Sequence, residues 1–210
     1  MEKRILVTGA NGFVGTNLCE VLTQNADLKV RAMVMKGTPL QELEALKSDG
    51  RDLGIVTANL TNPESLQSAC DGVHTIVHLA GVVTDWASPE LYQKVNVEGT
   101  RNLVEAASKN GVSRIVFMSS LTVHALSGHT YDDENAPRDM KKMAYGVSKI
   151  QAEDIIKGWA REDQTRDFAI VRPGFVIYGP HDQASFVQAL DAMLTGKFGF
   201  VNGGESLISY

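Results

Sequence analysis

The amino-acid sequence predicts an α/β fold in which helices cover both faces of a doubly wound parallel sheet. Short apolar runs rich in Val and Ile alternate along the chain with segments whose apolar residues recur at helical spacing. A helix that connects two successive strands makes those strands parallel, and parallel sheets are buried on both faces. The alternation therefore favours this class over an all-helical or all-β fold.

Six runs of apolar and β-branched residues predict strands at 4–8, 30–34, 55–57, 73–79, 114–118 and 168–171. Six intervening or following segments predict helices at 14–22, 40–46, 63–70, 89–109, 144–161 and 186–194. Pro63 and Pro89 stand where a first helical turn tolerates proline, and Asn110-Gly111 is typical of a helix end. Glycine punctuates the chain after Pro173 and interrupts the regular alternation.

The composition excludes several classes of protein. The 210 residues include 20 basic and 25 acidic side chains that are well mixed, so no basic patch for nucleic acid is expected. Two cysteines do not make a disulfide scaffold. No run approaches the ~18 apolar residues of a membrane span, and the start of the chain is not typical of a signal peptide. We expect a cytoplasmic protein with no membrane or nucleic-acid partner.

A glycine-rich turn joins the first strand to the first helix. Gly9, Gly12 and Gly15 have GxxGxxG spacing. In dinucleotide-binding folds such glycines turn the chain, admit a pyrophosphate close to backbone N–H groups and pack helix on strand. The helix N-terminus adds further N–H donors and the positive end of its dipole. A tight turn without a ligand is the alternative, but three glycines in register favour an NAD(P)-binding Rossmann fold.

The residues after the second strand bear on the choice of dinucleotide. An acidic residue about 20 positions beyond the glycines would bind the ribose 2′-OH of NAD. Here Met35 and Lys36 follow the strand, so the carboxylate is missing. Lys36, with Arg31, favours a 2′-phosphate and hence NADP over NAD, whereas a solvated lysine is the alternative interpretation.

Tyr145, Lys149 and Ser120 predict an acid–base site. The first two lie at i and i+4 of an expected helix, hence on one face. Ser120 follows the fifth strand, at the sheet edge where ligands bind in this fold class. A tyrosine needs its pKa lowered by ~2–3 units to act as a base near neutral pH, which a nearby ammonium group favours. The pattern predicts hydride transfer: Tyr145 exchanges the substrate proton, Lys149 holds the cofactor ribose, and Ser120 binds the reacting oxygen. A surface Tyr–Lys pair is the alternative.

Taken together and in order, six segments resemble the extended short-chain dehydrogenase/reductase family, also called the NAD-dependent epimerase/dehydratase family. They are TGANGFVG (8–15), HLAG (78–81), NVEGTRNLVEAA (96–107), FMSS (117–120), YGVSK (145–149) and RPGFVIYGP (172–180). Beside the three glycines and the Tyr–Lys pair, the resemblance implies cofactor contacts for Asn11, Phe13, Val14, Asn59, Leu60, Leu79, Ala80, Gly81, Asn96, Pro173 and Val176. It implies substrate contacts for Val83, Thr122 and Phe175, with Thr122 as the alternative to Ser120.

Two positions depart from the family pattern. Asn59 stands where the family usually has Asp near the adenine, and a neutral amide can still bind the adenine amino group. Phe175 stands where nucleotide-sugar enzymes usually have Asn. The sequence is in this respect similar to dihydroflavonol reductases and 3β-hydroxysteroid dehydrogenases, which favours an apolar ketone or secondary alcohol as substrate. A nucleotide-sugar epimerase or dehydratase is the alternative, and a non-catalytic dinucleotide-binding regulator is an alternative of another class.

The resemblance also implies the organisation of the chain. We expect the NAD(P)-binding domain at 1–172 and only the opening of a smaller substrate lobe at 173–210, because family members usually have about 300 residues. A homodimer through helices 89–110 and 144–161 is expected. No metal is expected, because His74 and His78 would lie ~13 Å apart on a strand.

Overall fold

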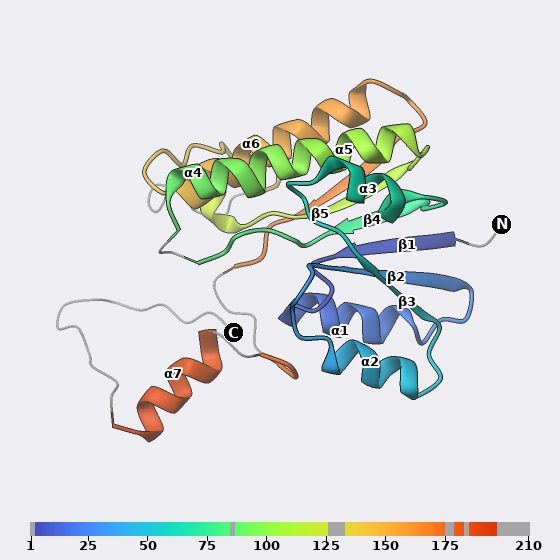
Figure 1. Ribbon diagram of the computed structural model, residues 1–210. Coiled ribbons are helices and arrows are strands. Elements are labelled where there is room, and N and C mark those ends of the chain that lie inside the picture. Colours follow the sequence, from blue (N-terminus) through green and yellow to red (C-terminus); the bar gives the residue numbers. More distant parts are fainter. Residues whose placement is uncertain (1–2, 85–86, 126–132, 175–178, 183–184, 197–210) are drawn as a thin grey trace.

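A computed structural model describes residues 3–84, 87–125, 133–174, 179–182 and 185–196 (Figure 1). It contains the expected sheet of six strands, all paired in parallel, in the order β3-β2-β1-β4-β5-β6. The strands are β1 Lys3–Thr8, β2 Leu28–Val34, β3 Leu53–Thr57, β4 Thr75–His78, β5 Arg114–Met118 and β6 Asp167–Val171. The predicted doubly wound α/β fold is confirmed.

Helices alternate with the strands along the chain in the expected order. They are α1 Phe13–Leu22, α2 Gln41–Ser48, α3 Pro63–Cys70, α4 Pro89–Tyr92, α5 Gly99–Lys109, α6 Ala144–Arg161 and α7 Ser185–Leu194, with a π-helical segment η1 Gln93–Glu98 and a short 3-10 turn η2 Leu121–Val123. In Figure 1, α1 and α2 lie on one side of the sheet, and α3, α5 and α6 lie on the other. The last four residues, Leu207-Ile208-Ser209-Tyr210, form an apolar run whose pattern predicts the beginning of a strand, and they lie outside the described residues.

The alternation of side chains along the central strands builds two cores. Leu6 and Ile76 face the core under α3, α5 and α6, whereas their neighbours Val7 and Val77 face the core under α1 and α2. Leu6, Val7 and Ile76 have no exposed surface. Because successive strand residues point to opposite faces, a strand covered on both sides must be apolar at consecutive positions, as the sequence pattern indicates.

The strand order reverses between β1 and β4. From β1 the chain moves outward to β2 and β3, then returns to pair β4 with the other side of β1. Thr8 and His78, the last residues of β1 and β4, stand opposite one another. The crevice beyond the carboxyl ends at such a reversal is where open α/β sheets bind their ligands.

One expected helix is built differently. The continuous helix predicted at 89–109 contains the π-helical segment η1, with α4 before it and α5 after it. The wider turn accommodates Asn96, whose carbonyl oxygen accepts a hydrogen bond of 2.5 Å from the Thr100 hydroxyl. Apolar periodicity does not distinguish a π turn from an α turn, so the sequence pattern could not predict this feature. Such turns are frequent at functional sites.

Candidate active site

A cavity of about 820 Å³ opens beyond the carboxyl ends of the strands. Sixteen of the predicted site residues line it: Gly9, Asn11, Gly12, Phe13, Val14, Gly15, Asn59, Leu60, Leu79, Ala80, Gly81, Val83, Ser120, Tyr145, Lys149 and Pro173. The structure therefore brings the glycine turn and the Tyr–Lys pair to one continuous cavity. Phe175 and Val176 lie outside the described residues.

The glycine turn is compact because side chains would not fit there. Gly9 has a φ of 66°, and a Cβ on it would stand 3.0 Å from the backbone N and Cα of Ala80. A Cβ on Gly15 would stand 2.2 Å from the Gly9 carbonyl oxygen. Glycine is therefore required at both positions, one for the turn and one for helix–strand contact.

The N-terminus of α1 suits an anionic group. Its N-cap is Gly12, no side chain caps it, and its first turn has no acidic residue. The first N–H groups of a helix have no partner within the helix, and the dipole is positive at this end. These residues fit a dinucleotide pyrophosphate, whose charge the helix end would stabilise and whose bulk the glycines leave room for.

A buried network of hydrogen bonds supports the adjoining cavity wall at residues 79–81. The Thr8 hydroxyl oxygen accepts from the backbone N–H groups of Leu79, at 3.1 Å, and Ala80, at 3.0 Å. Its proton is therefore available to Nδ1 of His78, 2.9 Å away. Nε2 of His78 lies 3.1 Å from the Thr100 hydroxyl oxygen. These hydrogen bonds hold the end of β4 and the cavity-lining segment at 79–81 in position.

Asn96 holds the same segment from behind. Its Oδ1 accepts from the Val82 N–H at 2.7 Å, and its Nδ2 donates to the Val82 carbonyl at 3.0 Å and to the Ser148 hydroxyl at 3.1 Å. Asn96 is buried, and a Cβ on Gly81 would stand 3.0 Å from its Oδ1. Asn96 thus supports the cavity wall and is not one of the residues that line the cavity.

Lys149 lies almost fully buried next to Tyr145. Its Nζ donates to the Met118 carbonyl at 2.9 Å and lies 5.6 Å from the centroid of the Tyr145 ring. Burial lowers the pKa of Lys149 to about 8, against the opposing effect of the Glu153 carboxylate, which raises it. The ammonium group is therefore positioned to stabilise a phenolate at Tyr145.

Ser120 is brought to Tyr145 by close contact between η2 and α6. The Ser120 Oγ accepts from the backbone N–H of Thr122 at 3.2 Å and from its hydroxyl at 2.9 Å. A Cβ on Gly146 would stand 2.2 Å from the Thr122 carbonyl oxygen, so only glycine permits this approach of the first turn of α6. Thr122 supports Ser120 and does not itself line the cavity.

Of the three residues expected at the adenosine end, only Asn59 lines the cavity. Arg31 is not available to a 2′-phosphate, because its guanidinium donates to the carbonyl oxygens of Ala69, at 2.8 Å, and Asp71, at 2.9 Å. Lys36 is exposed and does not line the cavity. The Asn59 Oδ1, which would accept from an adenine amino group, already accepts from the backbone and hydroxyl of Thr61, both at 3.0 Å.

Several cavity-lining residues were not predicted: Met33, Val34, Met35, Thr38, Ala58, Thr61, Val82, Leu91, Lys94, Val95, Met118, Ser119, Gly174 and Asp182. Most lie at strand ends or in the loops that follow them, so the carboxyl-edge rule for parallel sheets could have indicated them. Lys94 and Val95 belong to the π-helical segment, which the sequence pattern did not predict. Asp182 follows Pro180, whose carbonyl oxygen accepts from Asn17 of α1 at 2.7 Å.

The described residues contain no group of three His, Cys, Asp or Glu side chains that could hold a metal ion. His78 is buried between Thr8 and Thr100, whereas the exposed His74 contacts Thr75 at 2.8 Å. Among the helices that the structure describes, none is both long and apolar enough to cross a membrane.

Residues 5–202 match the model of the NAD dependent epimerase/dehydratase family. The chain belongs to this family. It is 36% identical, over 98% of its length, to N-acetyl-alpha-D-glucosaminyl-diphospho-ditrans,octacis-undecaprenol 4-epimerase of Escherichia coli O157:H7. It is 33% identical, over all of its length, to UDP-glucose 4-epimerase of Vibrio cholerae. The chain spans 58% and 63% of these two relatives.

Reductases and dehydrogenases of the epimerase/dehydratase family are similar to the chain as well. Identity to 3-beta-hydroxysteroid dehydrogenase of Mycolicibacterium neoaurum is 29% over 97% of the chain and 56% of the relative. Among solved structures, a mutated uronate dehydrogenase superposes with a TM-score of 0.67 at 30% identity, covering 82% of this chain and 58% of that one. The crystal structure of gox2253 gives a TM-score of 0.79 at 28% identity, covering 94% of this chain and 59% of that one.

Proposed function

We propose that the chain is the cofactor-binding part of an NAD(P)-dependent oxidoreductase that acts on a ketone or secondary alcohol. The observation that carries the proposal is the position of Lys149, whose ammonium lies 5.6 Å from the Tyr145 ring in the same cavity that the glycine turn lines. A surface Tyr–Lys pair does not account for a lysine that is 3% exposed and donates to a strand carbonyl.

Each residue has a distinct role in this proposal. Tyr145 exchanges the proton of the substrate oxygen, and Ser120 donates a hydrogen bond to that oxygen. Lys149 favours the phenolate form of Tyr145 by its charge and holds the cofactor ribose. Asn96 and Thr8 keep the 79–82 wall in place through the hydrogen bonds described above. These groups are preorganised by burial, so little reorganisation is needed when the substrate binds.

The glycine turn and the N-terminus of α1 would hold the dinucleotide pyrophosphate, and Leu79, Ala80 and Gly81 would form the adjoining wall. When bound, the dinucleotide supplies the hydride donor or acceptor. Because the Arg31 guanidinium is bound to carbonyl oxygens at the end of α3, Lys36 is the remaining residue that favours NADP over NAD. Lys36→Glu is expected to weaken NADPH binding more than NADH binding.

The walls near Tyr145 favour an apolar small-molecule substrate. The Tyr92 ring lies 5.9 Å from the Tyr145 ring, and the Tyr92 hydroxyl donates to the Thr84 carbonyl. Val83 and Leu91 are the sequence neighbours of Thr84 and Tyr92 and line the same cavity as Tyr145. These two residues are 67% and 42% exposed. Exposed apolar groups in a cavity wall are suited to bind an apolar part of a ligand.

A second candidate function is sugar 4-epimerisation, favoured by the 36% and 33% identity to two 4-epimerases. The same acid–base groups would serve, but the hydride would leave and return within one active site. We also propose a cytoplasmic location and a homodimer through α4–α5 and α6, where Ile150 and Ile155 are half-buried.

The two candidates differ in the net change of cofactor. The chain is first titrated with NADH and NADPH by calorimetry, and the preferred dinucleotide is then used with a panel of apolar ketones, secondary alcohols and UDP-sugars. Net oxidation or reduction of the nicotinamide supports the oxidoreductase. Conversion of a sugar to its 4-epimer without net nicotinamide change supports the epimerase. Binding of a dinucleotide without either conversion supports a regulator, and binding of neither dinucleotide overturns the proposal.

A further inference from the structure

Glu153 continues the functional face of α6. Tyr145, Lys149 and Glu153 occur at i, i+4 and i+8, so each lies one turn beyond the last on the same side of the helix. Glu153 has no exposed surface. A buried carboxylate is costly unless it is fully paired, so its partners show what the residue does.

The Glu153 carboxylate is saturated with donors. Its Oε1 accepts from the Ser119 hydroxyl at 2.7 Å and from Nε of Arg172 at 2.8 Å. Its Oε2 accepts from Nη2 of Arg172 at 2.8 Å and from Nη1 of Arg138 at 3.2 Å, and Nζ of Lys157 lies 3.6 Å away. Burial alone would raise the pKa of Glu153, but the hydrogen bonds from Arg172 and Ser119 and the charges of Arg172 and Arg138 lower it, so the residue stays ionised.

These partners come from the two strand ends that border the cavity. Ser119 follows β5 and directly precedes Ser120, while Arg172 follows β6 and directly precedes Pro173. A backbone hydrogen bond continues the pairing of β5 with β6 to this point, because the Ser119 N–H donates to the Val171 carbonyl at 2.7 Å. One carboxylate on α6 therefore contacts the residue before Ser120 on one strand and the residue before Pro173 on the next.

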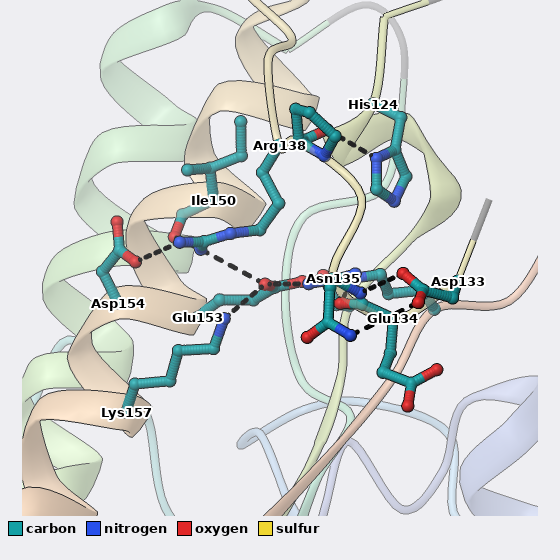
Figure 2. Close-up of polar contacts among 12 residues, drawn as sticks. His124, Asp133, Glu134, Asn135, Arg138, Ile150, Glu153, Asp154 and Lys157 are labelled. Carbon is teal, nitrogen blue, oxygen red and sulfur yellow. Dashed lines mark hydrogen bonds and ion pairs between the residues drawn. The ribbon is translucent and has the colours of Figure 1, made fainter. Parts of the chain in front are cut away.

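Arg138 closes the arrangement from the segment that leads into α6. Figure 2 shows Arg138 between Asp154 and Glu153, with Lys157 directed toward Glu153 from the same helix. Arg138 donates to Asp154 at 2.7 Å, but the Asp154 side chain is 58% exposed whereas that of Glu153 is buried. Arg138 thus binds two neighbouring carboxylates, those of Glu153 and Asp154. Only Glu153 also contacts residues at the ends of β5 and β6.

We propose that Glu153 is a positioning residue that holds the Tyr145–Lys149 face of α6 against the ends of β5 and β6. This inference rests on the proposed function of Tyr145 and Lys149 as catalytic residues. Glu153 does not touch the reacting atoms. It acts through Ser119 on the position of Ser120, through Arg172 on the position of Pro173, and through its charge on Lys149.

The charge effect follows from the surroundings of Lys149. His78 of β4 is neutral, and Nζ of Lys149 lies 5.0 Å from the Phe117 ring of β5 and 5.6 Å from the Tyr145 ring. Glu153 is the group that raises the pKa of Lys149 against burial, although the cations paired with Glu153 limit this effect. Loss of its charge would leave Lys149 in a cationic surrounding and lower its pKa further.

An ion pair that only stabilises the fold is the competing explanation, and the titration of Lys149 separates the two. The Lys149 ¹³Cε resonance, assigned with Lys149→Gln, is followed against pH in lysine-labelled protein. The parent protein is expected to titrate near pH 8. Glu153→Gln is expected to lower that midpoint by about one pH unit or more. Asp154→Asn is the control, because Asp154 binds the same arginine but is exposed to solvent. This change is expected to leave the titration midpoint of Lys149 unchanged.

Dinucleotide affinity gives a second measurement on the same proteins. A fall of one unit from pH 8 would reduce the protonated fraction of Lys149 at pH 8 from about one half to about one tenth. Glu153→Gln is therefore expected to bind NADPH about fivefold more weakly at pH 8 but to approach parent affinity at pH 6. Equal weakening at both pH values, with an unshifted Lys149 midpoint, would show that the residue serves only the fold and would overturn the inference.

If Glu153→Gln does not fold, Ser119→Ala tests the contact to β5 with the ion pairs intact. Removing this hydrogen bond is expected to weaken NADPH binding about fivefold. The control Ser113→Ala, at the opposite end of β5, is expected to have no effect, and equal effects of the two changes would overturn the inference. Failure of the parent protein to bind either NADH or NADPH contradicts the proposed function instead, and the Lys149 titration then still tests the contribution of Glu153.

Discussion

Thr8 and His78 end neighbouring strands and are joined by a 2.9 Å hydrogen bond between the threonine Oγ1 and the histidine Nδ1. Because the Thr8 oxygen already accepts two backbone N–H groups, its own proton points to Nδ1. The proton of His78 is therefore on Nε2, which donates to Thr100. The imidazole is neutral, and both of its nitrogens are committed to the wall of the cavity.

The neutral state of His78 makes stability depend on pH. Burial, with the nearby charge of Lys149, lowers the pKa of His78 to about 3. In the unfolded chain the group takes up a proton near pH 6.5, so the unfolded state binds more protons between pH 6.5 and 3. Stability is present in full above pH 6.5 and is lost as the pH falls. From pH 6.5 to 5 the loss attributable to His78 is about 2 kcal/mol.

Denaturant unfolding at several pH values checks this loss. The extra pH dependence is expected to disappear in His78→Gln and to remain in His74→Gln, which changes the exposed histidine before the same strand. ¹⁵N NMR gives the protonation directly. A neutral ring with its proton on Nε2 at pH 6 agrees with the structure, whereas a titration midpoint near 6.5 contradicts it.

Gly15→Ala is expected to damage both the fold and the dinucleotide site. The new Cβ would stand 2.2 Å from the Gly9 carbonyl oxygen and 2.7 Å from the Ala10 Cα, so the backbone of the turn must move. Overpacking of this kind typically costs ~1–3 kcal/mol. Calorimetric titration with NADPH should show weaker binding by at least about tenfold, since the turn is the phosphate site.

Gly158→Ala is the matched control for that change. Gly158 lies within α6, and a Cβ there meets no atom within 4 Å. Alanine in a helix interior is favoured over glycine, so this variant should be about 0.5–1 kcal/mol more stable and should bind NADPH normally. Equal effects of the two substitutions would show that the close contact at Gly15 has no special role.

Asn96→Leu is expected to loosen the wall at residues 81–82 without emptying the core. The leucine keeps the volume but removes the hydrogen bonds to both backbone groups of Val82, a half-buried residue whose N–H and carbonyl then lose these partners. The cost is about 1–3 kcal/mol in unfolding free energy. Hydrogen exchange at the Val82 amide should accelerate selectively, and unchanged exchange at that amide would contradict the supporting role of Asn96.

The sequence predicted most of the fold because its signals are local. β5 and α6 occur at the expected residues, since a short apolar run and a long amphipathic segment each have one dominant pattern. The side-chain partners of charged residues were harder to predict. Arg31 was expected only to assist Lys36 at a 2′-phosphate, but the folded chain places its guanidinium against the C-terminal end of α3.

The candidate site was predicted in part for the same reason. The spacing of the three glycines and of Tyr145 and Lys149 can be read from the sequence, and all five residues line the cavity. The role of Asn96 as a support depends on a π-helical turn that apolar periodicity does not reveal. Glu153 does continue the Tyr145–Lys149 spacing by one turn, but its partners Ser119 and Arg172 become visible only once β5 and β6 are paired.

The central claim is that Tyr145 exchanges a proton at the end of a dinucleotide site. Tyr145→Phe tests it most directly, in a comparison of NADPH affinity with the rate of nicotinamide absorbance change on a substrate from the panel. The account predicts nearly unchanged affinity and turnover lower by about 10²–10⁴-fold, the usual contribution of a general acid or base. Unchanged turnover in the phenylalanine variant would contradict it.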